Sequence, residues 1–139
     1  MSILQTQTTS FKAELYQGVH NLTTDVIKIA LYTGDANLNE ATTVYTSNNE
    51  VVGAGYTAGG KVMTGITVNS SGFTAYVGFT NVYWDPGAFT TRCALIYNSS
   101  KGNKSIAVLD FGSDKTAVSD FAIVMPANTP TTALIRSSV

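Results

Sequence analysis

The chain has 139 residues, of which 44% are apolar and only 12% are charged, and its net charge is −1. This length fits about one domain, and the apolar content excludes an intrinsically disordered chain, which needs low hydrophobicity and high net charge. The Lys and Arg residues are scattered singly and no apolar run approaches the roughly 20 residues that cross a bilayer, so we expect neither a nucleic-acid nor a membrane partner.

The first ten residues are polar and rich in Thr and Gln, and we predict that residues 1–10 form an arm outside the folded domain. They lack the basic and apolar regions of a secretory signal, which predicts synthesis in a cytoplasm. Ile3 and Leu4 are adjacent apolar residues within this arm. A short strand or hook on a neighbouring chain would use them, so both are candidate partner-binding residues.

A short helix is expected next, over residues 11–18. Phe11, Leu15 and Val19 recur at four-residue spacing, as on one face of a helix. Ser10 stands where a residue that caps the helix N-terminus is favoured.

From residue 25 the apolar pattern changes to the two-residue period of β-strands. In residues 25–33, Ile27, Ile29 and Leu31 point to one side and the residues between them to the other. Further strands are predicted at residues 61–68, 73–80, 82–85, 92–98, 105–111, 121–125 and 131–137, with turns at residues 69–72 and at Pro86-Gly87.

About eight short strands after a single helix predict an all-β protein. We expect an antiparallel β-sandwich, jelly-roll-like, with a short N-terminal helix and an arm, and a single sandwich domain over residues 11–139. Helices do not alternate with the strands, which disfavours a parallel α/β sheet.

The connection over residues 34–60 is long, polar and rich in Asn and Gly. Long ordered loops on a rigid scaffold usually serve binding or assembly. Tyr and Trp make effective interface anchors because they offer a large contact area with few rotatable bonds. Candidate partner-binding aromatics are Tyr45, Tyr56, Tyr83 and Trp84. The same side chains can stack on sugars, so a carbohydrate-binding β-sandwich module stays open.

Catalysis would need a nucleophile and a base, and the sequence offers one His and one Cys. Cys93 lies within a strand pattern, where a small buried residue is the usual role, and as the single cysteine it excludes an internal disulfide. His20 follows the expected helix, where it would serve as an ordinary cap or cation. We therefore predict no enzyme and assign no catalytic residue.

Three stretches resemble ligand motifs only in part. Residues 35–40 start like a calcium loop, but Glu40 and Thr46 stand where Gly and Glu are required. Glycines 53 and 55 lack the third glycine of a dinucleotide fingerprint and precede a strand, so turns with positive φ are the better interpretation. Asp110-Phe111-Gly112 has no other kinase motif beside it and is interpreted as a strand end. We predict no metal and no cofactor.

Three segments together resemble a known family: "FKAELYQGVHNLTTDVIKIALYT", "YTAGGKVMTGITV" and "ALIYNSSKGNKSIAVLDFGSDK". Their order and motifs are similar to those of small β-sandwich virion structural proteins of tailed bacteriophages. The resemblance covers most of residues 10–115 and rests on structural motifs, so it implies no active site.

The resemblance implies a capsid cement or decoration protein that stabilises the head by bridging subunits of the major capsid protein. It further implies a homo-oligomer, located on the capsid surface of the virion after synthesis in the host cytoplasm. A tail or tail-fibre structural component is the main alternative, and the carbohydrate-binding module is the second.

Overall fold

The computed structural model describes residues 2–138, so Met1 of the expected arm and Val139 of the expected domain lie outside the described residues. The fold is all-β and sandwich-like with one short N-terminal helix, which confirms the predicted fold class. A five-stranded antiparallel sheet forms the centre, in the order β2-β10-β9-β3-β5. Its strands are β2 (Thr6–Gln7), β3 (Ile27–Tyr32), β5 (Lys61–Val62), β9 (Phe89–Asn98) and β10 (Lys104–Ala117).

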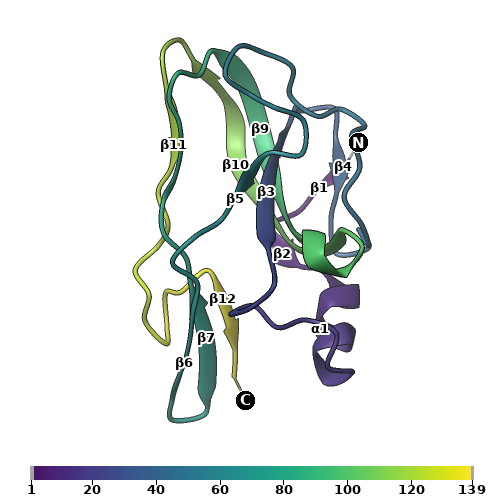
Figure 1. Ribbon diagram of the computed structural model, residues 1–139, viewed down its shortest axis with the longest axis vertical. Helices are drawn as coiled ribbons and strands as arrows, with labels where there is room; N and C mark the ends of the chain where they lie inside the picture. The colour runs from purple at the N-terminus through teal and green to yellow at the C-terminus, as the bar shows by residue number, and fades with distance from the viewer. Residues whose placement is uncertain (1, 139) are drawn as a thin grey trace.

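Smaller sheets form a second layer across from the central sheet (Figure 1). One is the pair β8 (Val82–Trp84) and β11 (Phe121–Ile123). The other has the order β12-β7-β6, with β6 (Thr67–Ser71), β7 (Thr74–Gly78) and β12 (Ile135–Ser137). In Figure 1, β11 runs along the left side, and β6, β7 and β12 lie below it.

The central sheet is buried on both faces. On β3, Ile27, Ile29 and Leu31 face the second layer and pack with Trp84, as the two-residue period predicted. Ala30 and Tyr32 on the opposite face are also fully buried, in a second core with Leu95, Tyr97 and Val108. A β-sandwich strand normally exposes one face, so something must cover the second one.

The cover comes from the long connection and the N-terminal segment. Leu38 in β4 (Asn37–Leu38) is buried in the second core, and Ile3 and Tyr45 pack against it. β4 pairs in parallel with β1 (Ser2–Ile3), and β2 pairs with β10. The expected arm is therefore corrected for the described part: residues 2–7 belong to the sheets of the domain. Strands of two residues are too short to show the alternating pattern by which a strand is recognised in a sequence.

Helix α1 (Thr9–Tyr16) begins two residues before the predicted start. Its cap is Thr8, whose Oγ1 accepts a hydrogen bond from the backbone N–H of Phe11, and Ser10 is inside the first turn. Phe11 is buried, while Leu15 is partly exposed. The predicted cap, Ser10, was wrong. Ser and Thr are both favoured at the N-cap, so the sequence alone could not choose between Ser10 and Thr8.

Three further boundaries differ from the prediction. The expected strand over residues 61–68 divides into β5 and β6, because Gly65 turns with a φ of +62° against Thr80. The hairpin turn lies at Gly72 and Phe73, since β6 continues to Ser71. Asp110-Phe111-Gly112 does not end a strand: β10 continues to Ala117 through a bulge between Asp110 and Lys115.

Candidate functional site

Tyr83 is the predicted partner-binding aromatic that the fold presents to solvent. It lies in the middle of β8 and is 56% exposed, between the buried Val82 and Trp84. The Nζ of Lys61 donates a hydrogen bond to the Tyr83 carbonyl oxygen, and the Nδ2 of Asn81 lies 3.3 Å from the Tyr83 hydroxyl. The Lys61 bond holds the backbone and the Asn81 bond restrains the ring before any partner arrives, which lowers the entropy cost of binding.

Trp84 is not a surface anchor, and its prediction as a partner-binding residue is corrected. Only 1% of its surface is exposed, because strand alternation turns it into the core when Tyr83 points out. Its ring packs against Phe89 and Phe121, and the Lys61 ammonium lies 5.7 Å from its ring centroid. An aromatic platform for sugars therefore cannot include Trp84.

Tyr45 and Tyr56 are half-buried and bind a carboxylate inside the long connection. The Tyr45 hydroxyl donates to Glu50 Oε1 at 2.6 Å, and the Tyr56 hydroxyl donates to Glu50 Oε2 at 2.5 Å. The backbone N–H of Gly59 adds a third bond to Oε2 at 2.8 Å. We call Glu50 with these three donors the Glu50 cluster. It closes the connection onto the sheet, since Tyr56 also accepts a bond from the Leu31 N–H.

The electrostatics of this cluster keep its tyrosines neutral. Burial, followed by the hydrogen bond to Glu50, raises the pKa of Tyr45 and of Tyr56 far above the ordinary range. Burial and the charge of Glu50 raise the pKa of Tyr97 to about 12. The hydroxyls thus stay donors at any physiological pH, which suits a structural clamp.

Sequence reasoning missed Glu50. The available signal was its isolation, because Glu50 is the single charged residue in the stretch from residue 41 to residue 60. A lone charge within an uncharged, Tyr-containing loop points to a buried partner set, since an exposed carboxylate needs no such neighbours.

His20 belongs to a chain of hydrogen-bonded polar side chains that come from α1, the loop before β3, β9 and the β9–β10 turn, and of which His20 and Asn98 are buried. The two amide hydrogens of Asn98 go to His20 Nδ1 at 2.9 Å and to Asp25 Oδ2 at 2.8 Å. Because Nδ1 accepts, the ring proton is on Nε2, which donates to Glu14 Oε1 at 2.8 Å. Lys101 completes the chain with a bond of 2.9 Å to Asp25.

Asp25 carries a perturbed titration within this chain. Burial acts to raise its pKa, but hydrogen bonds from the Asn21 N–H, the Asn98 amide and the Lys101 ammonium prevail and lower it to about 2. Cys93, predicted as a buried strand residue, is confirmed as fully buried, and burial raises the pKa of its thiol to about 12. A neutral buried thiol is a poor nucleophile.

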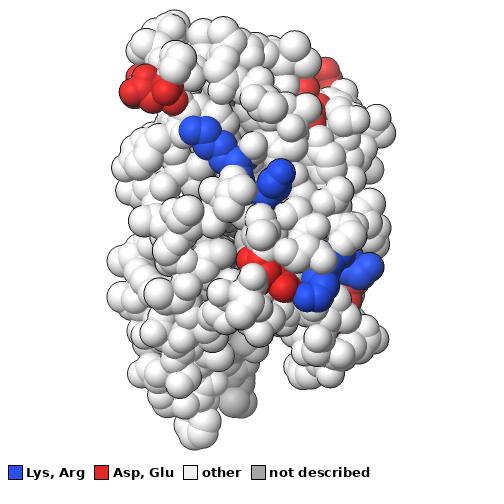
Figure 2. Space-filling view, viewed as in Figure 1, with Lys and Arg blue, Asp and Glu red and all other residues white. Residues whose placement is uncertain are grey.

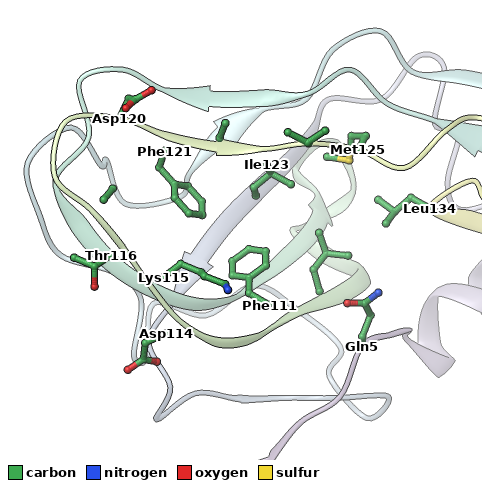
Figure 3. A pocket seen from close by; sticks show the side chains of 14 residues that line it. Gln5, Phe111, Asp114, Lys115, Thr116, Asp120, Phe121, Ile123, Met125 and Leu134 are labelled. Carbon is green, nitrogen blue, oxygen red and sulfur yellow. The ribbon is translucent and has the colours of Figure 1, made fainter.

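A groove of about 600 Å³ opens between the end of β10 and β11 (Figure 3). Phe111, Phe121, Ile123, Met125 and Leu134 supply an apolar lining, and Asp114, Lys115 and Asp120 lie around it. Phe111 and Asp114, which lie in the bulge of β10, are among its lining residues. Such a groove can hold an apolar side chain or a short apolar segment.

The remaining motif-like stretches take turn conformations. Residues 35–40 hold no calcium loop: β4 lies within them, and the Asn39 side chain accepts from the Ala41 N–H in the turn that follows. Gly55 has a positive φ as predicted, and so do Gly59 and Gly60, whereas the prediction was wrong for Gly53. Within residues 2–138 no group of three or more His, Cys, Asp or Glu side chains comes together. No helix in that range is long and apolar enough to cross a membrane.

Comparisons with protein-family models, with curated proteins and with solved structures found no match to this chain.

Proposed function

We propose that this chain is a structural protein of a tailed-bacteriophage virion, and that it acts as a capsid cement or decoration protein by binding the major capsid protein. The segments that carry the family resemblance contain β3, β5 and most of the β9–β10 hairpin, which supply four of the five strands of the central sheet, together with most of α1 and the start of β6. Their role is to form a scaffold that is buried on both faces, which suits a part under mechanical load.

Tyr83 is the observation that carries the proposal. A half-exposed aromatic ring whose hydroxyl accepts a hydrogen bond from the Asn81 amide is the type of residue that dominates protein interfaces. Even a modest contact of roughly 800 Å² per partner fixes an assembly when symmetry repeats it around a capsid. Ile3 and Leu4 contribute less to such a contact, since Ile3 already packs on the second core.

The test measures occupancy on expanded heads that lack this protein. Purified wild-type protein and the variant Tyr83→Ala are incubated with such heads and separated from unbound protein by sedimentation. Tyr83→Ala should lower the affinity by at least about tenfold, the effect of losing an interface anchor. The control is Tyr16→Ala, which removes a tyrosine from the end of α1 that is even more exposed than Tyr83, and it should leave binding unchanged.

The alternatives have separate outcomes. Binding to purified tails and not to heads would replace the cement role with a tail role. Binding to a glycan array, lost in Tyr83→Ala, would favour the carbohydrate-binding module. No binding to any of the three would refute the proposal.

A further inference from the structure

The outer strand β6 has a free edge. Among the residues that the structure describes, β6 pairs with β7 alone and stands at the end of its three-stranded sheet. Figure 1 shows it on the outer side of the molecule, with no other segment beyond it. Four of its five residues are exposed. An edge of this kind presents unpaired backbone N–H and C=O groups, which bind another extended strand.

The register of the hairpin tells which groups point outward. Ser71 pairs with Thr74 across a two-residue turn that starts at Gly72, whose φ is +57°. The closing pair of such a hairpin is hydrogen-bonded, and hydrogen-bonded pairs alternate along the ladder. Thr67, Asn69 and Ser71 therefore bond to β7. The N–H and C=O groups of Val68 and Ser70 point away from it.

This edge lacks the protection that exposed edges usually carry. Natural edges are blocked by Lys, Pro, bulges or a covering segment. Residues 62–84 contain no charged residue and no proline. The lower left of Figure 2, where β6 and β7 lie, is correspondingly free of charged side chains. Val68, which is 53% exposed, and Phe73, which is 86% exposed, add apolar surface beside the edge.

We propose that β6 pairs with β6 of a second copy of this chain, antiparallel and around a two-fold axis at Asn69. In this register Val68 of each copy faces Ser70 of the other, and about four backbone hydrogen bonds form. Two three-stranded sheets become one continuous sheet. A second copy fits because pairing an uncharged strand with itself brings no like charges together, whereas a charged strand would repel its own copy.

This inference gives an interface to the homo-oligomer that the family resemblance implies, and it rests on the proposed function for its biological setting. Its test is independent of any particle, because it measures the mass of the full chain in solution. Sedimentation equilibrium of wild-type protein up to about 1 mM should show twice the chain mass of 14.7 kDa. Ser70→Pro removes an outward N–H without removing a bond to β7, and it should weaken the dimer at least about tenfold.

Two oppositely charged variants distinguish loss of the dimer from loss of folding. Asn69→Lys and Asn69→Glu each place like charges directly opposite across the two-fold axis, so each variant alone should be monomeric. Their equimolar mixture should restore a dimer, a result that mere unfolding cannot give. A third variant, Asn69→Cys, should cross-link under oxidation, while Ser71→Cys should not, because residue 71 faces residue 67 of the partner in this register.

Each outcome decides the proposal. A wild-type monomer at all concentrations would overturn it, and so would a dimer that survives Ser70→Pro and both charge variants. Cross-linking through residue 71 and not residue 69 would overturn the register. A monomer that still binds phage heads would refute the β6 dimer and leave the proposed function intact.

Discussion

At the scale of single residues, two buried carboxylates hold the loops of this protein, and they do so in different ways. Glu50 accepts bonds from neutral donors, so its surroundings stabilise it without an opposing charge. Asp25 combines an amide, a backbone N–H and an ammonium. The stabilisation from the Glu50 cluster is therefore insensitive to salt, while the stabilisation from Asp25 depends on pH.

We predict that Glu50→Ala lowers the free energy of unfolding by about 3 kcal/mol, because two tyrosine hydroxyls and the Gly59 N–H lose their acceptor in a half-buried site. Chemical denaturation measures the change. Glu40→Ala is the matched control: it lies in the same connection but is exposed, and it should change stability by less than about 0.5 kcal/mol. Equal effects of the two substitutions would contradict the clamp role.

The titration of Asp25 predicts a stability change at acid pH. Its pKa is about 2 in the folded chain against 3.8 for the free side chain, so its contribution is present above about pH 4 and is lost as the pH falls toward 2. Asp25→Asn cannot titrate. The stability advantage of wild type over this variant should therefore shrink across that window, as thermal melts at a series of pH values would show. A constant difference would mean that Asp25 is not held by its three donors.

At the scale of elements, alternation predicted strands well except where a glycine interrupts it, as Gly65 does in the expected strand over residues 61–68. β3 and the β9–β10 hairpin lie where alternation and turn residues indicated. The sequence did not predict the short strand pairings β1–β4 and β2–β10, because a strand of two residues shows no alternation and the paired strands lie far apart along the chain. The Glu50 cluster was not predicted for a related reason: its donors are five to nine residues away on an irregular loop.

Deletion of residues 2–7 tests whether these pairings carry stability. The deletion removes β1, β2 and the bond from the Asp110 N–H to the Gln5 side chain, while Thr8 remains to cap α1. We expect a loss of about 3 kcal/mol, which lowers the melting temperature by roughly 10 °C. Leu4→Ala, which trims a half-exposed side chain in the same segment, should leave the melting temperature nearly unchanged. A truncated chain that melts like wild type would instead support the prediction that this segment is an arm outside the domain.

At the scale of the whole molecule, charge is distributed unevenly. Two ion pairs between permanently charged side chains are found among the described residues, Arg92 with Asp110 on the central sheet and Lys101 of the β9–β10 turn with Asp25. The layer with β6 and β7 carries none of them. One part of the molecule is thus held by polar side-chain chemistry, while the β6–β7 hairpin offers an uncharged surface beside β12, which carries the exposed Arg136.

This unevenness predicts how self-association responds to salt. Pairing through β6 uses backbone hydrogen bonds and uncharged side chains, and the Debye screening that weakens exposed ion pairs does not act on them. The dissociation constant of the wild-type dimer should change less than about twofold between roughly 50 mM and 500 mM NaCl. The mixed dimer of Asn69→Lys and Asn69→Glu adds opposite charges at the axis, so it should weaken as salt rises. Sedimentation of both samples makes the comparison, and a wild-type dimer that dissociates steeply with salt would place its interface on the charged part of the molecule.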